Sequence, residues 1–398
     1  MLFMKIEVKN LYKIFGKGPQ KIVPLLEEGM DKEEILKKTG NSVGVNNASF
    51  QVNEGEFFVI MGLSGSGKST LLRCLNRLIE PTSGEILIDG QDVLKCNEEE
   101  LREIRRKKMA MVFQNFGLLP HRTVCKNVEF GLEIQGIDEK IRTEKAYEAL
   151  ELVGLKGYEE KMPHELSGGM QQRVGLARGL ATEPEILLMD EAFSALDPLI
   201  RKDMQQEMIE IQFKMRKTII FITHDLDEAL RLGDRIAIMK DGVIEQIGTP
   251  EDILANPASE YVRKFTQDVD RTKVMTAGAI MQRTNVIIST KDGPKAAARA
   301  MEEQGISSIY VIDKDRILQG IVKIDDAIES YKKGERDISD IIIKEVAITS
   351  PETSIAELLP IAKDISYPIA VVDKENKMLG IIKRSTIIAG IIGEEECR

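Results

Sequence analysis

The feature that most constrains this chain is a glycine-rich loop at residues 62–70, which reads Gly-Leu-Ser-Gly-Ser-Gly-Lys-Ser-Thr. An apolar, β-prone run at residues 57–61 precedes the loop, and a helix-favouring run that starts at Leu71 follows it. A strand, a loop with this spacing and a helix together make a phosphate-binding loop. Backbone amides and the positive end of the helix cradle the phosphates, Lys68 reaches the β- and γ-phosphates, and the Ser69 hydroxyl ligates Mg²⁺. The loop therefore predicts a nucleotide-driven protein.

A second element is the apolar run at residues 186–189, which Asp190 and Glu191 follow. Such a run suits a strand buried on both faces, and the carboxyl end of a buried strand is where open α/β sheets bind ligands. Asp190 is then placed to hold Mg²⁺, and Glu191 to orient or deprotonate the attacking water. The alternative is that the two acidic residues only begin a loop, which is much less expected beside a phosphate-binding loop.

Two more polar residues follow predicted strands. His224 comes directly after the apolar strand at residues 218–223, and Gln114 comes after the strand at residues 109–113. Both side chains therefore fall on the same ligand-binding edge of the sheet. We predict that His224 contacts the γ-phosphate and that Gln114 senses Mg²⁺ or the lytic water, whereas a lone histidine at such a place is otherwise more often structural.

Length, charge and apolar content limit the class of protein. A chain of 398 residues exceeds one ordinary core and predicts two or three domains. Its net charge of −10 argues against a nucleic-acid partner, because binding to phosphate backbones depends on Lys and Arg. No run approaches the roughly 18 apolar residues of a membrane span, and the first residues lack a signal-peptide layout. We therefore expect a cytoplasmic chain whose four cysteines are reduced.

The first part of the chain, residues 5–248, mixes β-type apolar runs with helical segments, which is typical of an α/β domain. An insertion at about residues 17–43 interrupts this plan. Within it Asp31-Lys32-Glu33-Glu34 resembles a capping box and Gly40 suits a helix end, so a short surface helix is expected. The predicted strands are 57–61, 86–89, 109–113, 186–189, 218–223 and 235–240.

An internal repeat begins after residue 270. Residues 307–322 match residues 367–382 at a constant offset of 60. Each copy reads as a helix (295–304 or 354–364), a strand, an Asp-containing turn, a strand and a helix, and repeats of this kind are modules that pack on each other. Residues 393–398 form a short acidic tail to which we assign no structure.

In their order along the chain, these motifs resemble those of ATP-binding-cassette (ABC) ATPases over residues 5–250. The family's elements are a Walker A loop at 62–70, a Q-loop at Gln114, an LSGG signature at 166–169, a Walker B strand with Glu191, a D-loop ending at Asp197 and a switch histidine at His224. Phe15 matches the family's aromatic residue that stacks on adenine, although the insertion after it departs from the common pattern. The resemblance implies ATP and Mg²⁺ as cofactors.

The resemblance also assigns roles to single residues. Catalysis is assigned to Glu191, His224 and Gln114, and Mg²⁺ binding to Ser69, Gln114 and Asp190. ATP binding is assigned to Phe15, Gly62, Ser64, Gly65, Gly67, Lys68, Ser69, Thr70, Ser167, Gly168, Gly169 and Asp197. Because Ser167-Gly168-Gly169 opens a helix, its amides form a second anion site. The resemblance implies that this site closes on ATP held by another subunit, so the ATPase is expected to act as a homodimer.

The 60-residue repeats, each ending in a Gly-Ile-aliphatic step, resemble a tandem of cystathionine-β-synthase (CBS) domains. An import ATPase with such a pair resembles the glycine betaine/proline betaine/carnitine osmoprotectant uptake family, which has a similar N-terminal insertion. The implied fold is α/β: a P-loop ABC-type nucleotide-binding domain with a helical subdomain, followed by an α+β tandem CBS pair. The expected ranges are 1–265 for the ATPase, 266–273 for a linker, and 274–331 and 337–392 for the CBS domains.

This resemblance implies integral-membrane permease subunits and a substrate-binding protein or domain as partners. They would hold the chain peripherally at the cytoplasmic face of the membrane. Residues 114–124 resemble the importer surface that receives a permease coupling helix, and Phe116, Leu118 and Leu119 suit such a patch if they are exposed. Simple burial is the alternative.

The cleft of a CBS pair suits an adenine nucleotide, and the family suggests cyclic di-AMP. Asp326, Tyr367 and Arg384 are the candidate contacts. The alternatives at this point are that Tyr367 is buried, that Arg384 is solvated, or that the CBS pair has a purely structural or ion-sensing role.

We therefore predict the ATP-hydrolysing subunit of an importer that powers uptake of a compatible solute and is regulated through its CBS domains. An importer ATPase for another small polar solute is one alternative. A soluble ABC ATPase that acts on nucleic acid or ribosomes is another, but such proteins usually have two cassettes or a long coiled-coil insertion. An exporter ATPase fits the loop after Gln114 and the CBS pair less well.

Overall fold

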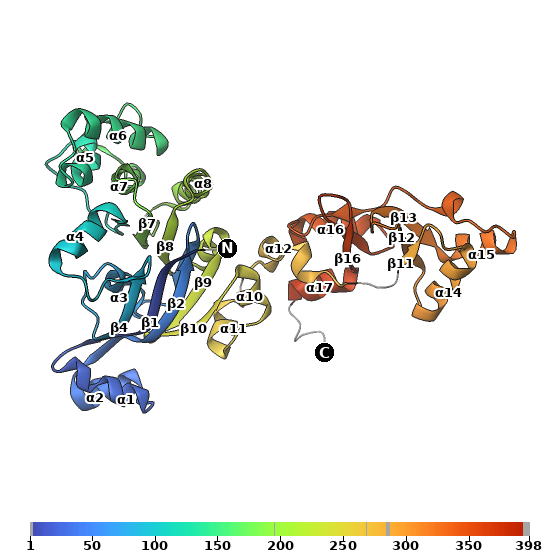
Figure 1. Cartoon of the computed structure of the whole chain (residues 1–398), viewed down its shortest axis with the longest axis horizontal. Coiled ribbons are helices and arrows are strands. Elements are labelled where there is room, and N and C mark those ends of the chain that lie inside the picture. Colours follow the sequence, from blue (N-terminus) through green and yellow to red (C-terminus); the bar gives the residue numbers. More distant parts are fainter. Residues whose placement is uncertain (1–2, 195, 268, 284–286, 393–398) are drawn as a thin grey trace. The chain divides into compact units, whose positions relative to one another are not determined.

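The computed structural model describes residues 3–194, 196–267, 269–283 and 287–392 (Figure 1). The chain divides into two compact units, one of residues 1–267 and one of residues 268–398. The acidic tail predicted at residues 393–398, with Cys397, lies outside the described residues. No helix in the described ranges is long and apolar enough to cross a membrane.

The centre of the first unit is a six-stranded sheet in the order β10-β9-β3-β8-β7-β6. Its strands from β9 to β6 run parallel, and β10 pairs antiparallel with β9. Every residue of β3, β7 and β8 is buried, as expected for apolar runs covered on both faces. The bounds are β3 Phe57–Met61, β6 Met109–Val112, β7 Ile186–Asp190, β8 Thr218–Thr223, β9 Arg235–Lys240 and β10 Val243–Gly248.

A second, antiparallel sheet of the first unit has the order β2-β1-β4-β5. The strand predicted at residues 86–89 belongs to this sheet, as β4, and not to the central one. The stacked rings of Phe50 and Phe58, with centroids 5.3 Å apart, join the two sheets in one core with helix α3. The bounds are β1 Met4–Phe15, β2 Ser42–Asn53, β4 Ser83–Ile88, β5 Gln91–Asp92 and α3 Lys68–Leu75.

The insertion folds as two short helices after a 3-10 turn at Pro19–Lys21: α1 Val23–Glu27 and α2 Lys32–Thr39. The predicted helix is confirmed, since the Asp31 side chain accepts the Glu34 N–H at its start and Gly40 ends it at φ 72°. Its Ile35 is fully buried in a small core with Ile22, Leu26 and residues of β1 and β2. The insertion is therefore anchored on the antiparallel sheet rather than loosely attached.

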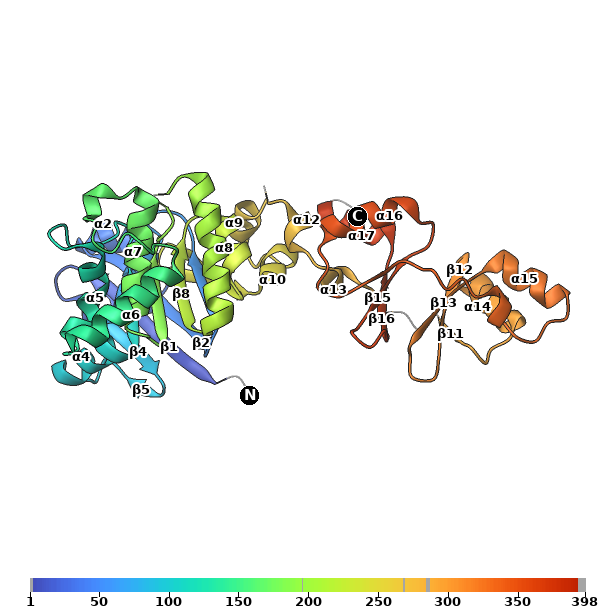
Figure 2. The ribbon, with the colours of Figure 1, turned by 90° about the horizontal axis from the view of Figure 1, so that it is seen from above.

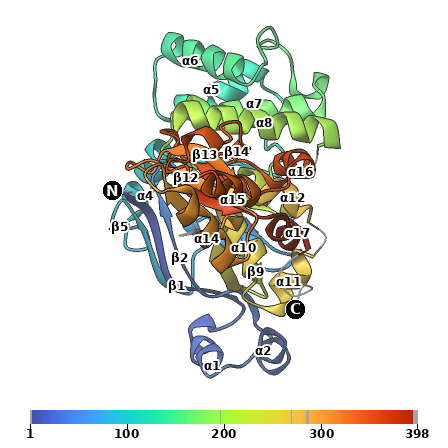
Figure 3. The ribbon, with the colours of Figure 1, turned by 90° about the vertical axis from the view of Figure 1, so that its right-hand side faces the viewer.

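Helices form a separate layer at the other end of the first unit. Helices α5, α6 and α7 lie opposite α1 and α2 in both Figure 1 and Figure 3. The buried carboxylate of Glu129 joins α5 to α6, because it accepts hydrogen bonds from Thr143 at 2.7 Å and Arg142 at 3.2 Å. The remaining helices of this unit are α4 Glu98–Lys107, α5 Val124–Ile134, α6 Glu139–Leu152, α7 Gly168–Ala181, α8 Pro198–Met215, α9 Leu226–Leu232, α10 Pro250–Ala255 and α11 Glu260–Phe265.

The second unit contains two three-stranded sheets, β11-β12-β13 and β14-β15-β16. Figure 2 shows α14 and α15 beside the first sheet and α16 and α17 beside the second. The strands are β11 Ile287–Ser289, β12 Ser308–Ile312, β13 Leu318–Lys323, β14 Ile348–Thr349, β15 Ile369–Val372 and β16 Met378–Ile382. The helices are α12 Arg271–Val274, α13 Ala277–Ile280, α14 Pro294–Gln304, α15 Ile324–Lys332, α16 Ile355–Asp364 and α17 Arg384–Ile392.

The two repeats are related by an internal two-fold arrangement. The N–H of Leu318 donates to the Asn376 carbonyl and that of Met378 donates to the Arg316 carbonyl, so each bond is the other shifted by 60 residues. Close packing requires the glycine in each Gly-Ile step. A Cβ on Gly320 would collide with the backbone carbonyl of Ile343, and a Cβ on Gly380 would collide with that of Gln282. The sequence repeat is therefore a structural repeat.

Candidate active site

The phosphate-binding loop connects β3 to α3, as the sequence predicted. Gly67 has φ 102°, and a Cβ there would collide with the Gly44 carbonyl, so only glycine fits this turn. The Lys68 side chain is 4% exposed and its ammonium donates to the carbonyls of Gly62 at 2.9 Å and Leu63 at 3.1 Å. These contacts keep Lys68 inside the curl of the loop.

Two features of this loop fit a bound phosphate. Burial lowers the pKa of the Lys68 ammonium from its ordinary value, and the carboxylates of Glu191 and Asp190 only partly oppose that effect. The Ser66 hydroxyl is buried, and no described residue bonds to it. A buried cation and a buried hydroxyl without a partner are groups that an anion would satisfy.

Glu191 is the centre of the site. Its Oε2 accepts a hydrogen bond from Gln114 Nε2 at 3.2 Å and lies 3.4 Å from His224 Nδ1, and its Oε1 lies 4.0 Å from Lys68 Nζ. Glu191 also has φ 47°, an uncommon conformation for a residue with a side chain and one that often marks functional sites. The structure therefore brings together four residues that lie far apart in the sequence.

Asp190 is the last residue of β7 and is 2% exposed. Its Oδ1 accepts the Ser69 hydroxyl at 2.8 Å, and its Oδ2 accepts Arg73 at 3.0 Å. Among the described residues no group of three or more His, Cys, Asp or Glu side chains could hold a metal by itself. Any cation held here would need ligands beyond Asp190 and Ser69.

Phe15 lies at the end of β1 and is 41% exposed. Gly44 lies next to both Phe15 and Thr70, because a Cβ on Gly44 would be 2.9 Å from the Phe15 ring and 3.0 Å from the Thr70 methyl group. The predicted aromatic residue therefore lies beside the end of the phosphate-binding loop, despite the insertion that follows it.

Ser167 is the N-cap of α7, where its hydroxyl accepts the Met170 N–H at 3.3 Å. Ser167 and Gly168 are exposed, whereas Gly169 packs on Ile200 of α8. Asp197 is also exposed, at the start of α8. Within the described ranges no hydrogen bond or ion pair joins residues 167–169 to the cluster around Glu191. The structure does not bring the signature and the phosphate loop into contact within one chain.

The loop after Gln114 is tied to α7. Arg178 donates to the carbonyls of Phe116 at 3.1 Å and Gly117 at 2.6 Å, and burial lowers the pKa of its guanidinium. The three apolar residues of this loop that the sequence singled out, Phe116, Leu118 and Leu119, are each half-buried.

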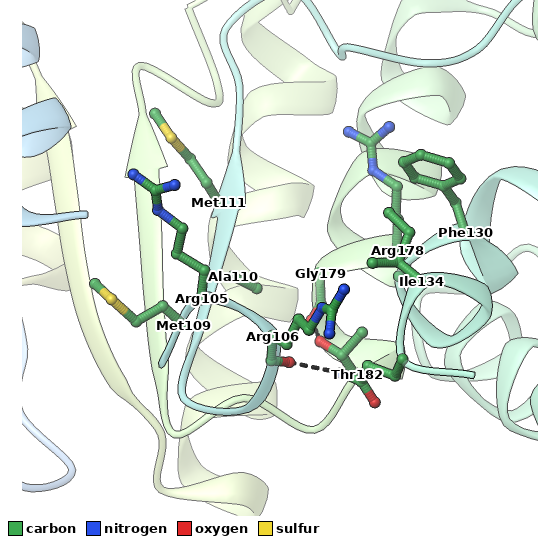
Figure 4. Close-up of a pocket in the computed structure, with 12 residues that line it drawn as sticks. Arg105, Arg106, Met109, Ala110, Met111, Phe130, Ile134, Arg178, Gly179 and Thr182 are labelled. Atoms are coloured by element: carbon green, nitrogen blue, oxygen red, sulfur yellow. Dashed lines mark hydrogen bonds between the residues drawn. The ribbon is translucent and has the colours of Figure 1, made fainter. Parts of the chain in front are cut away.

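Arg178 also lines a cavity of about 300 Å³ between α4, β6, α5 and α7. In Figure 4 Phe130, Ile134 and Arg178 lie on one side of this cavity and Arg105, Met109 and Met111 on the other. Apolar side chains and arginines therefore share its walls.

In the second unit a cavity of about 440 Å³ lies between the repeats. None of the three residues that the sequence singled out lines it, but their neighbours Ser366, Pro368 and Lys383 do. Asp326 lies in the first turn of α15, and Tyr367 packs against the core that the two repeats share. Arg384 donates to the carbonyls of Ala362, Lys363 and Ile365, so it caps the end of α16.

The three cysteines that the structure describes, Cys74, Cys96 and Cys125, are free and buried. Burial raises the pKa of Cys74 and of Cys125 to about 12, so these thiols are poor nucleophiles.

Sequence reasoning did not single out Arg73, Arg178 or Lys32, whose Nζ donates to the Gly65 carbonyl of the phosphate-binding loop at 3.1 Å. No local signal marks them, because long basic side chains are common on surfaces and only the fold brings their ends to these acceptors.

The chain matches two family models. The model described as ABC transporter matches residues 45–194, and the CBS domain model matches residues 277–333 and 338–393. The glycine betaine transport ATP-binding protein OpuAA of Bacillus subtilis strain 168 is 55% identical, over 99% of this chain and 94% of its own length. The glycine betaine/carnitine transport ATP-binding protein GbuA of Listeria monocytogenes serotype 1/2a (strain 10403S) is also 55% identical, over 98% of each chain.

Two solved structures of the bacterial ABC transporter cassette MJ0796 are also similar. The dimeric cassette is 34% identical with a TM-score of 0.53, covering 62% of this chain and 98% of its own. Its dimeric post-hydrolysis state, bound to ADP and Pi, is 33% identical with the same TM-score and coverage. The two relatives named above are similar to this chain over both of its units.

Proposed function

The chain belongs to the ABC transporter ATP-binding proteins, and from this membership we propose that it is the ATPase subunit of an importer for glycine betaine or a related compatible solute. The observation that carries the ATPase part is the position of Glu191, within 4.0 Å of Lys68 and within hydrogen-bonding reach of Gln114 and His224. The solute class is supported by OpuAA and GbuA, whose similarity extends through both units.

The residues around Glu191 suggest how hydrolysis proceeds. Lys68 supplies positive charge to the β- and γ-phosphates of ATP, in a buried place where that charge is weakly screened. The Glu191 carboxylate orients the attacking water or takes its proton, while Gln114 and His224 hold that carboxylate in place. Bound Mg²⁺ would neutralise charge on the phosphates. Ser69, Asp190 and Gln114 are the residues proposed to hold it, with phosphate oxygens and water as the other ligands.

We further propose that two copies of the chain sandwich ATP, each signature contacting the nucleotide of the other copy. Support comes from the exposed Ser167 and Gly168 at the start of α7, because the first backbone amides of a helix attract anions. The ring of Phe15, exposed beside Thr70, is proposed to stack on adenine.

A permease is proposed as the second partner, and its attachment would hold the chain at the cytoplasmic face of the membrane. The cavity lined by Phe130, Ile134 and Arg178 suits a cytoplasmic segment that carries apolar side chains and a carboxylate. Because Arg178 binds the loop that follows Gln114, docking there is physically connected to the Glu191 cluster. A substrate-binding protein or domain would deliver the solute from the other side.

The function is tested by reconstitution with the permease and binding protein of the same system. We expect ATP-dependent uptake of glycine betaine into vesicles. Ile134→Asp, which places a charge in the cavity, should abolish co-purification with the permease and lower uptake more than tenfold. The matched control is Ile141→Asp, an equally exposed isoleucine of α6 outside the cavity, which should retain both. Uptake of an unrelated solute alone, or ATPase activity stimulated by ribosomes or RNA, would contradict the proposal.

For the second unit we propose a regulatory adenine nucleotide, with cyclic di-AMP as the first candidate. Asp326, Tyr367 and Arg384 are the residues predicted from the sequence. The cavity between the repeats supports such a site, and it favours Lys383 over Arg384 as the phosphate contact, because Arg384 already binds three carbonyls. The regulator would bias closure of the cassettes by a few kcal/mol at most.

Calorimetric titration of cyclic di-AMP into the whole chain is expected to show saturable binding. A chain truncated before Val274 should show no heat of binding and should retain its basal ATPase activity. Lys383→Ala should weaken binding about tenfold, as expected for loss of a charge-assisted phosphate contact. If neither cyclic di-AMP nor AMP binds the whole chain, only an ionic or structural role for this unit is left.

A further inference from the structure

The insertion makes a direct contact with the phosphate-binding loop. Lys32 is the first residue of α2, and its Nζ atom lies 3.8 Å from Asp241 Oδ1. The same Nζ atom donates the hydrogen bond to the Gly65 carbonyl. Asp241 belongs to the turn between β9 and β10, so Lys32 joins three segments of the first unit. Its side chain is 33% exposed, which leaves the ammonium only partly hydrated.

The Gly65 carbonyl is thus held by a residue outside the phosphate-binding loop. The next carbonyl, that of Ser66, accepts the Gly242 N–H at 2.9 Å. A trans peptide unit is planar, with its carbonyl and N–H on opposite sides. A donor that fixes the Gly65 carbonyl on the outer side therefore directs the Ser66 N–H inward. In agreement, that N–H donates to the Leu63 carbonyl, which the Lys68 ammonium also contacts.

Lys32 is held in position more firmly than the other lysines of α2. It directly follows the N-cap Asp31, and the next turn of the helix contains Ile35, which is fully buried. Lys37 and Lys38, by contrast, form only exposed pairs with Glu33 and Glu34 of the same helix. Lys32 is the lysine of α2 that contacts the loop, in the part of the chain that the structure describes.

We propose that the insertion is a positioning element for the phosphate-binding loop and that Lys32 is the residue through which it acts. This proposal rests on the proposed binding of ATP by the phosphate-binding loop. Lys32 holds the Gly65–Ser66 peptide in one orientation, with its amide on the inner side of the loop, before the nucleotide arrives. Pre-organisation of this kind raises affinity because less ordering is needed on binding. Lys32 does not itself touch the reacting atoms.

The test compares Lys32→Met with Lys37→Met, which removes a charge from the same helix without touching the loop. In the nucleotide-free chain, Lys32→Met should speed amide hydrogen exchange of Ser66 and Gly67 about three- to tenfold. The dissociation constant for ATP should rise by about the same factor, as expected for loss of one partly exposed hydrogen bond from a charged donor. The maximal ATPase rate at saturating ATP should change less than twofold. Lys32→Arg should restore affinity, and Lys37→Met should match the parent chain.

Several outcomes would overturn the inference. One is an unchanged exchange rate at Ser66 and Gly67 together with an unchanged ATP affinity in Lys32→Met. Another is an equal loss of affinity in Lys37→Met, which would indicate a general effect of charge. A lower melting temperature with normal ATP affinity would assign Lys32 a purely structural role. The parent chain separates this result from the proposed function, since failure of the parent to bind ATP would contradict the function and not the role of Lys32.

Discussion

Replacing Glu191 with glutamine is expected to lower the ATPase rate about 10²- to 10⁴-fold while ATP affinity stays close to that of the parent chain. Glutamine keeps the size of the side chain and can still accept the hydrogen bond from Gln114 through its carbonyl oxygen. It cannot accept a proton from the attacking water. Because hydrolysis would release the two subunits, the variant should accumulate as an ATP-bound dimer.

Phosphate release and size-exclusion chromatography with ATP measure these two effects. Glu228→Gln is the matched control, because Glu228 is a buried carboxyl group of α9 that accepts the hydroxyl of Thr223 but lies outside the cluster. Burial raises the pKa of Glu228, so its neutral form is favoured and an amide is a mild replacement. Its ATPase rate should stay within a few-fold of the parent. Turnover of Glu191→Gln near the parent rate would remove Glu191 from the mechanism.

Replacing Ser167 with arginine is expected to lower ATPase activity more than 100-fold and to leave ATP binding by the single chain intact. The new side chain would stand at the exposed start of α7, where its bulk and charge oppose closure on the nucleotide of the other subunit. The substitution also removes an N-cap, which contributes about 1 kcal/mol to helix stability. Ser167→Ala removes the same cap without adding bulk and should retain most of the ATPase activity.

Mixing two inactive variants gives the sharper test. Lys68→Ala disables the phosphate-binding loop and Ser167→Arg disables the signature, so neither homodimer has a complete site. A mixed dimer has one site with a normal loop from one subunit and a normal signature from the other. Recovery of ATPase activity on mixing is therefore expected. No recovery, or loss of ATP binding by Ser167→Arg alone, would contradict a shared site.

Much of the candidate site was predictable because its parts follow the carboxyl ends of neighbouring parallel strands. The rule that these ends meet at one edge of the sheet predicted that Gln114, Glu191 and His224 would lie together, and they do. The helix of the insertion was predictable for a different reason, since Asp31 and Gly40 act on backbone groups only a few residues away. The antiparallel sheet was not predicted as such, because its pairing of β1, β2 and β4 depends on long-range register.

The sequence by itself determined what depends on short stretches of chain: the phosphate-binding loop, the caps of α2 and the repeat of 60 residues. Only the tertiary structure decided where long side chains end. Lys32 meets the Gly65 carbonyl, Arg73 meets Asp190, and Arg384 caps α16 instead of remaining free for a ligand. The physical reason is that the flexible side chains of Lys and Arg find their partners after the backbone is placed. Capping and glycine turns, by contrast, are settled by backbone geometry within a few residues.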